Sequence, residues 1–316
     1  MAEAAGKGPL EPWSRVDAIL AACRAGGISV IALDGADYPE ELGHLSDPPP
    51  VLYVRGDLST LNRPRVVIVG SRRATAYGRR VAETLAAEAA RSGWLVVSGM
   101  ALGVDGAAHR GALEAGGTSA AVLGSGPDRP TPRAHAGLAE RLRSRGCLLS
   151  ELPPGAPARP HHFPRRNRIL AALGAKIVVV EAARRSGALI TARLALELGR
   201  EVWAAPSSVF SPVCEGTHLL LEDGARPVVT PAHWREALGA ASPHPEASEP
   251  TPELVESWDA HARAVWAALE AGSRTLDELL GDRTLQGAEV LSALTRLELD
   301  GWVCRSSGGA FRRRAA

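Results

Sequence analysis

The feature that most constrains the fold is a unit of strand, glycine- or serine-containing turn and helix, repeated from residue 65 to residue 205. Strands are predicted at residues 66–69, 95–97, 120–123, 147–150, 176–180 and 201–205. The first is a continuous β-branched run, which is typical of a strand buried on both faces of a sheet. Strands that alternate with helices in this way form a parallel sheet with helices on both faces. We therefore expect an α/β, Rossmann-like fold.

Four segments of different character follow one another along the 316 residues. We expect residues 1–55 to form a short N-terminal extension with a remnant helical module and a strand. Residues 56–238 carry the repeats and are expected to form the Rossmann-like domain. Residues 239–256 include a stretch rich in Ala, Ser, Pro and Glu, which is typical of a flexible linker. Residues 257–316 show three helical patterns and a terminal hairpin, which predict a small winged helix-turn-helix domain.

Composition excludes several classes of protein. The 36 basic and 35 acidic residues give a formal charge of +1, so any phosphate binding has to be local rather than a bulk-charge effect. No Cys or His spacing suits zinc, and we expect neither a metal nor a cofactor. The N-terminus lacks signal-peptide character, and no apolar run approaches the roughly 18–20 residues that cross a bilayer. We therefore expect a cytoplasmic protein that contacts no membrane.

Small and hydroxyl-bearing residues stand where the predicted strands end. They are Gly70, Ser71, Ser98, Gly99, Gly124, Ser186 and Gly187. In a doubly wound sheet these ends meet at one edge, where glycines let an anion approach the backbone and helix N-termini supply N–H donors. Arg72 and Arg73 follow the first turn and can clamp a phosphate. The pattern predicts a phosphate cradle, and the absence of G-x-G-x-x-G and P-loop motifs argues against a conventional dinucleotide or triphosphate site.

A second cationic segment lies between the fourth and fifth predicted strands. It contains Arg159, Phe163, Arg165, Arg166, Asn167 and Arg168, beside two histidines. An aromatic ring for base stacking beside arginines for phosphates is how proteins hold single strands without sequence preference, at roughly 1–3 kcal/mol per stacked base. The segment therefore favours single-stranded DNA over a mononucleotide.

Structural roles compete with binding roles for several of these residues. Ser71 and Thr75 are also suited to be helix caps, and Phe163 to be a core residue. The arginines of the second segment could form a solvated helix face. For Arg168, a buried ion pair with Glu181 is the alternative.

Two other functions stay open at this point. Asp105 and His109 lie four residues apart on one predicted helix and could be a general acid and base, although a structural hydrogen-bonding role is favoured. A nucleotide-processing enzyme of the lysine-decarboxylase-like Rossmann group would carry a P-G-G-x-G-T stretch, to which residues 124–127 come nearest. A nucleotide sensor would hold a small nucleotide in the same cradle and use the winged helix as its output.

Four motifs, in this order along the chain, resemble those of the DNA-processing protein A family, also called DprA or Smf. They are 66–75 (VVIVGSRRAT), 97–105 (VSGMALGVD), 163–169 (FPRRNRI), and 180–182 (VEA) with 186–192 (SGALITA). The resemblance covers residues 28–234 and implies a recombination mediator with no established catalytic activity. Such a protein binds and protects incoming single-stranded DNA during natural transformation, loads the RecA recombinase and forms a homodimer through its Rossmann domain.

The same resemblance places the family's DNA pocket at particular residues of this chain. They are Ser71, Arg72, Arg159, Phe163 and the group from Arg165 to Arg168. The chain departs from the family pattern at Leu102 (usually Arg), Ser207 (usually Gly), His218 (usually Asn) and Thr131-Pro132 (usually Tyr-Pro). The loss of an arginine at Leu102 weakens the charge at the second strand end.

The C-terminal domain is poorly equipped to read duplex DNA. Residues 251–316 hold 8 Arg and 10 Asp or Glu, a local charge of −2. The predicted recognition helix, residues 286–298, carries Glu289 and Glu298, and Arg296 is its single basic residue. A major-groove reader needs a cationic helix. We therefore expect a protein-contact module or a weak duplex binder, of which the protein-contact module is slightly favoured.

Overall fold

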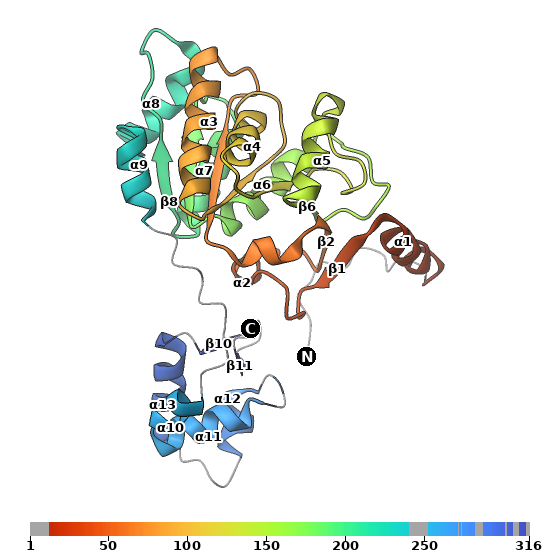
Figure 1. Cartoon of the computed structure of the whole chain (residues 1–316), viewed down its shortest axis with the longest axis vertical. Helices are drawn as coiled ribbons and strands as arrows, with labels where there is room; N and C mark the ends of the chain where they lie inside the picture. Colours follow the sequence, from red (N-terminus) through yellow and green to blue (C-terminus); the bar gives the residue numbers. More distant parts are fainter. Residues whose placement is uncertain are drawn as a thin grey trace. The chain divides into compact units, whose positions relative to one another are not determined.

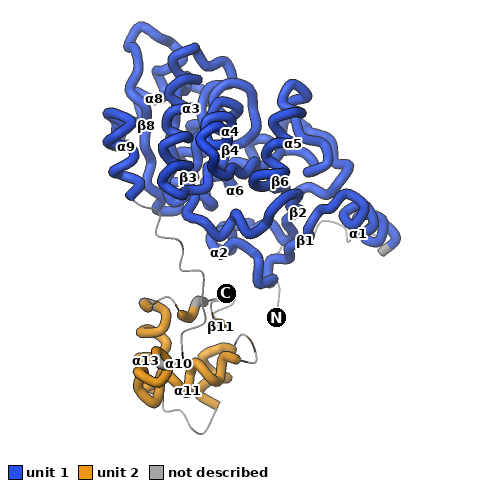
Figure 2. The backbone as a smooth tube through the Cα atoms, in the orientation of Figure 1, with its two compact units in different colours: residues 1–243 blue, residues 244–316 orange. Residues whose placement is uncertain are grey.

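The computed structural model describes residues 13–239, 252–270, 272, 274–281, 287–300, 302–305 and 310–313. The chain divides into two compact units, residues 1–243 and 244–316, which are described separately (Figure 2). No helix in the described part of the chain has the length and apolar character needed to span a membrane.

A nine-stranded sheet organises the first unit (Figure 1). Its strands, from edge to edge, are β1 (Ile28–Ala32), β2 (Val51–Gly56), β6 (Gly146–Ser150), β5 (Ser119–Val122), β4 (Leu95–Ser98), β3 (Arg65–Gly70), β7 (Lys176–Val180), β8 (Glu201–Ala204) and β9 (Arg226–Pro227). In this order, every neighbouring pair from β6 through β5, β4, β3, β7 and β8 to β9 is parallel. Strand β2 pairs antiparallel with β6, and β1 pairs antiparallel with β2. The predicted α/β, Rossmann-like fold is confirmed. The expected extension, residues 1–55, supplies two strands of this same sheet, so the predicted boundary at residue 55 falls within one sheet.

Helices cover both faces of the sheet, as the alternating pattern predicts. The first face carries α3 (Ala76–Arg91), α4 (Val104–Glu114) and α9 (Pro231–Leu238), and the second carries α6 (His162–Leu173) and α7 (Gly187–Glu197). Strand β3 is buried on both sides: Val66 and Ile68 pack with the first layer, Val67 and Val69 with the second. This is the physical reason for its unbroken β-branched run.

The strand order fixes where a ligand crevice opens. From β3 the chain proceeds through β4 to β5 on one side, and later returns to β7 on the other. The order therefore reverses between β3 and β7, and such a switch point opens a crevice at the carboxyl ends of the strands. The turns at Gly70 and Glu181 lie at this place.

The first unit contains further α-helices. They are α1 (Trp13–Gly26), α2 (Glu40–Gly43), α5 (Ala136–Ser144) and α8 (Glu215–Glu222). Helix α2 is tied to the sheet by an ion pair between Glu41 and Arg65, whose Nε also donates to the Leu173 carbonyl at 3.0 Å. Burial lowers the pKa of the Arg65 guanidinium, and Glu41 opposes that shift.

The second unit is a small helical domain with a two-stranded hairpin. It contains α10 (Pro252–Ser257), α11 (Ala260–Ala268), α12 (Leu276–Leu280), α13 (Gly287–Leu299), β10 (Val303–Arg305) and β11 (Phe311–Arg313). Trp258 packs against Trp266 and Trp302 at the centre of its core. Helix α10 begins inside the predicted linker 239–256, of which residues 240–251 lie outside the described part of the chain.

Candidate nucleic-acid interface

The turn after β3 is held in place by Glu181, which follows β7. The Ser71 amide donates to the Glu181 carbonyl oxygen at 2.6 Å, and the Thr75 amide donates to its carboxylate at 2.8 Å. The Thr75 hydroxyl also donates to this carboxylate, and Thr75 caps α3 by accepting from the Gly78 amide. Glu181 is buried and has a positive φ of 50°. The Glu181 carboxylate therefore already occupies the N-terminus of α3.

The carboxyl end of β4 is likewise occupied by side chains of the protein itself. The Ser98 hydroxyl is buried and donates to the Ile68 carbonyl at 2.6 Å. One Asp105 carboxylate oxygen accepts from the Ala101 amide at 3.1 Å, at the start of α4. Gly99 leaves room for this carboxylate, since a Cβ there would lie 2.7 Å from its Oδ2 and 2.5 Å from the Arg166 guanidinium. The glycine serves internal packing rather than an open cradle.

Arg166 is a buried cation that joins these strand ends. Its side chain is 4% exposed and donates to the Gly99 carbonyl at 2.9 Å and to the Val122 carbonyl. Burial lowers the pKa of Arg166 to about 10, with Asp105 opposing the shift, so it stays charged at neutral pH. Burial likewise raises the pKa of Asp105, and Arg166 opposes that shift. Arg166 is therefore not presented to a ligand.

A cluster that reaches the surface lies beside these buried groups. It is formed by the exposed Arg72, the half-buried Phe163 and the buried Gly124, and is called the Arg72–Phe163 cluster below. The guanidinium carbon of Arg72 lies 5.0 Å from the centroid of the Phe163 ring. A Cβ on Gly124 would lie 3.1 Å from Cδ1 of Phe163, so the ring closely approaches the third strand end. His162 fixes the start of α6 there, because its Nδ1 lies 3.1 Å from the Gly124 carbonyl oxygen. Three chain segments therefore meet around one half-buried ring.

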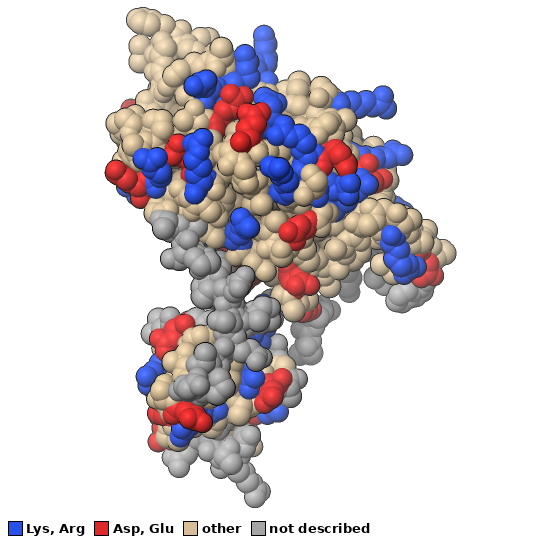
Figure 3. Space-filling view, in the orientation of Figure 1, with Lys and Arg blue, Asp and Glu red and all other residues tan. Residues whose placement is uncertain are grey.

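The remaining arginines of the predicted site differ in whether they form ion pairs. Arg168 pairs with Glu151 at 2.7 Å, and Arg165 approaches the same carboxylate at 3.5 Å. The suggested pairing of Arg168 with Glu181 is therefore wrong. Arg73 and Arg159 are exposed and form no ion pair within the described residues. Figure 3 shows Lys and Arg side chains along the top and right margins of one face of the first unit, with Asp and Glu between them.

The predicted residues on α6 and α7 meet through Asn167. Its side-chain amide donates to the Gly187 carbonyl at 3.3 Å, and the buried Asn167 thereby ties the two helices together. Ser186 caps α7 by accepting from the Ala188 amide at 3.3 Å. Ser71 plays a similar local role, since its hydroxyl accepts from the Arg73 amide at 3.1 Å. These hydroxyls shape turns in addition to any contact with a ligand.

Gly70 stands where β3 approaches β7 most closely. A Cβ on Gly70 would lie 1.8 Å from the Val180 carbonyl oxygen, so no larger residue fits this pairing. Leu102 is 48% exposed in the loop after β4. Ser207 and His218 contact one another, because Nε2 of His218 lies 3.2 Å from the Ser207 carbonyl oxygen.

Asp105 and His109 do not form a catalytic pair. Within the buried sheet the Ser119 hydroxyl donates to the Val96 carbonyl at 2.6 Å, so it accepts from Nδ1 of His109 at 2.7 Å. Burial lowers the pKa of His109 to about 3, which keeps the ring neutral. The geometry supports the structural role, and no group of three or more potential metal ligands occurs among the described residues.

Glu181, Glu151 and His162 were not identified as site residues from the sequence. Each acts on a residue far away along the chain: Glu181 on Thr75, Glu151 on Arg168 and His162 on Gly124. A local pattern carries no signal for such pairings, because they arise only when the strand ends come together. The structure thus separates a buried set that shapes the site from an exposed set that can meet a ligand.

Comparison with known proteins agrees with this architecture. Residues 29–239 match the family model of DNA recombination-mediator protein A, and residues 245–309 match the DprA winged helix domain. The chain is 40% identical to DNA processing protein DprA of Bacillus subtilis over 217 residues, 68% of this chain and 73% of that protein. It is 37% identical to protein Smf of Escherichia coli over 302 residues, 91% of this chain and 78% of that protein.

A solved structure of a relative gives the same result. DNA processing protein A from Helicobacter pylori, studied for its single-stranded DNA binding mode, superimposes with a TM-score of 0.62 at 30% identity. The match covers 67% of this chain and 95% of the H. pylori chain. The winged helix expected at the C-terminus is confirmed by the domain match. This chain therefore belongs to the DNA-processing protein A (DprA/Smf) family.

Proposed function

We propose that this protein binds single-stranded DNA at the Arg72–Phe163 cluster and acts as a recombination mediator. The observation that carries the proposal is the placement of one half-buried aromatic ring between an exposed arginine and the backbone of Gly124. A base can stack on such a ring while the arginine holds the adjacent phosphate. The H. pylori relative, which binds single-stranded DNA, supports the choice of ligand.

Phosphate contacts fall to exposed side chains rather than to helix N-termini. The Glu181 carboxylate accepts from the Thr75 amide at the start of α3, and Asp105 accepts from the Ala101 amide at the start of α4, so both helix starts already hold a carboxylate. Arg72, Arg73 and Arg159 are exposed and adjoin the turn after β3 and the start of α6. They can each form a two-pronged contact with a phosphate oxygen pair. We assign Arg165 a weaker share, since Glu151 neutralises part of its charge.

The finer biological role follows the family. In this proposal the protein protects incoming DNA during natural transformation, loads a RecA-type recombinase and performs no catalysis on the strand. The buried state of His109, Asp105 and Arg166 supports a binding role, because these groups are engaged inside the fold.

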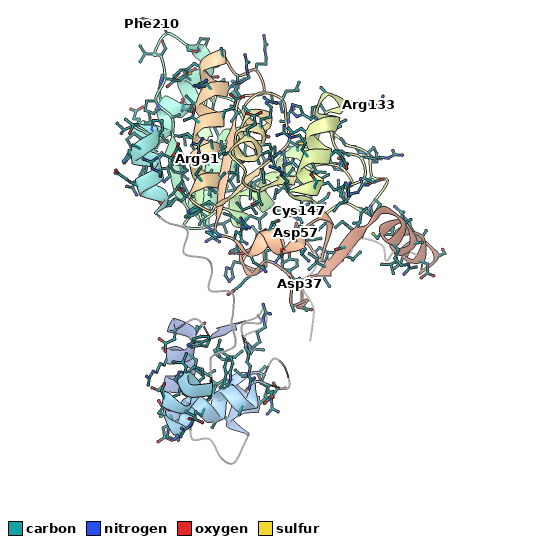
Figure 4. The ribbon with its side chains drawn as sticks, in the orientation of Figure 1. Asp37, Asp57, Arg91, Arg133, Cys147 and Phe210 are labelled. Atoms are coloured by element: carbon teal, nitrogen blue, oxygen red, sulfur yellow. The ribbon has the colours of Figure 1, made fainter. Side chains whose placement is uncertain are left out.

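We further propose a homodimer through the Rossmann domain. Val209 and Phe210, neighbours in the loop after β8, are 78% and 93% exposed, and Figure 4 labels Phe210. Adjacent large apolar side chains this exposed support a surface that is covered in an assembly.

Fluorescence anisotropy of a labelled single-stranded oligonucleotide across a salt series tests the DNA-binding proposal. Arg72→Ala should weaken binding and reduce the slope of log K against log salt by about 0.7, the value for one phosphate contact on a single strand. Arg91→Ala is the matched control, because Arg91 carries the same charge at the other end of α3 (Figure 4). Equal losses of DNA affinity in both variants would show that binding depends on net charge alone. A mononucleotide that competes at equal molar affinity would assign the pocket to a small ligand instead.

A further inference from the structure

The outward face of α13 in the winged helix carries a shallow, open groove. The groove has a volume of about 520 Å³ and is lined by Ala288, Leu291, Ser292, Thr295, Arg296 and Asp300. These residues recur at helical spacing on the side of α13 opposite to the buried Val290, Leu294 and Leu297. In a winged helix-turn-helix this helix is the one that enters a DNA groove.

Leu291 is the large apolar residue of this lining. It is 49% exposed, and Leu280 of α12, 38% exposed, extends the apolar surface toward the start of α13. The two helices adjoin there, since a Cβ on Gly287 would lie 3.7 Å from Cδ2 of Leu280. The Thr295 hydroxyl donates to the Leu291 carbonyl at 2.8 Å within the helix, so it is not needed for a ligand. The face offers apolar contact rather than hydrogen-bond donors.

The charge around the groove is negative. Arg296, the basic residue of the lining, is neutralised by Asp259 at 3.3 Å and by Asp300 at 3.9 Å. Glu289 stands on the same helix, 46% exposed, with Nε2 of His261 at 3.4 Å. Among the described residues, two carboxylates therefore contact the Arg296 guanidinium, and a third, that of Glu289, lies on the same helix beside His261. Such a surface disfavours a phosphate backbone, the usual occupant of a recognition helix.

A second copy of the same face is also disfavoured. A two-fold contact would bring the apolar stripes together but would set two net negative surfaces against each other. A partner that satisfies both the stripe and the charge needs apolar residues on one helical face and cations beside them. We propose that α13 docks a basic amphipathic helix of a partner protein, with apolar residues at helical spacing against Leu291 and with Lys or Arg opposite Glu289 and Asp300.

Anisotropy with two labelled peptides and the full chain tests this proposal. The first probe is an 18-residue helical peptide with Leu at i, i+3 and i+7 spacing and Lys elsewhere, and the second has Glu in place of each Lys. The Lys peptide should bind the wild type, and Leu291→Glu should weaken its binding by tenfold or more. Leu196→Glu is the matched control, because Leu196 is 53% exposed on α7 of the other unit.

A charge exchange separates this surface from nonspecific attraction. The double variant Glu289→Lys with Asp300→Lys should lose affinity for the Lys peptide and gain it for the Glu peptide. Both positions are about half exposed, so the fold should persist, and a retained melting transition of the second unit checks this. The proposal is overturned if Leu291→Glu and Leu196→Glu behave alike, if wild type binds both peptides equally, or if it binds duplex DNA more tightly than the Lys peptide.

Discussion

Replacing Glu181 with glutamine isolates the buried carboxylate that holds the turn after β3. Glu181 accepts from both the amide and the hydroxyl of Thr75, and its negative charge faces the N-terminus of α3. Glutamine has nearly the same shape, but it keeps one acceptor oxygen and turns an N–H₂ group toward the second donor. The variant thus changes charge and hydrogen bonding while leaving the packing volume unchanged.

The expected loss can be worked from these contacts. One hydrogen bond to a charged group contributes about 1.5–3 kcal/mol, and a carboxylate at a helix N-terminus adds about 0.3–1 kcal/mol. An amide costs less to bury than a carboxylate, which offsets part of this sum. We expect a net loss of about 2 kcal/mol in the free energy of unfolding of the first unit. For a unit of this size that lowers Tm by about 4–8 °C.

Calorimetry of the full chain measures the effect with an internal reference. The two units should melt in separate transitions, so the winged helix transition should stay fixed while that of the first unit moves. Glu197→Gln is the matched control, because Glu197 is exposed near the end of α7. Affinity for single-stranded DNA should fall without a change in salt slope, since Arg72 remains. A Tm within about 1 °C of wild type would refute the assigned role of the carboxylate.

Two further predictions concern buried ionisable groups. Arg166→Met should destabilise the first unit by about 3–5 kcal/mol, because it leaves Asp105 buried without its compensating cation. Adding Asp105→Asn should recover part of the loss in a double-mutant cycle, and additive losses would argue against coupling. His109 has a folded pKa of about 3, below its unfolded value, so its contribution to stability is present above pH 6.5 and is lost as pH falls toward 3. Between pH 7 and pH 5 this amounts to about 2 kcal/mol, and His109→Gln should show a shallower pH dependence of unfolding in urea.

Periodicity was sufficient to predict the central fold. The β-branched run at 66–69 and the glycine turns after each strand identify a doubly wound sheet, because those features follow from local sterics and burial on both faces. The antiparallel strands β1 and β2 were not assigned to the same sheet. Their place depends on the pairing of β2 with β6, roughly ninety residues later along the chain, and no local pattern encodes that pairing.

The residue types at the strand ends could be predicted from the sequence, because each turn directly follows its strand along the chain. The sequence did not determine which of them face a ligand. Arg165 and Arg166 are neighbours, yet one is 57% exposed and the other 4%, since successive residues on a helix point about 100° apart. Only the packing of α6 onto β4 and β5 decides that Arg166 is buried with Asp105. Likewise, only the meeting of β3 and β7 sets Glu181 at the start of α3, where the buried carboxylate repels a second anion.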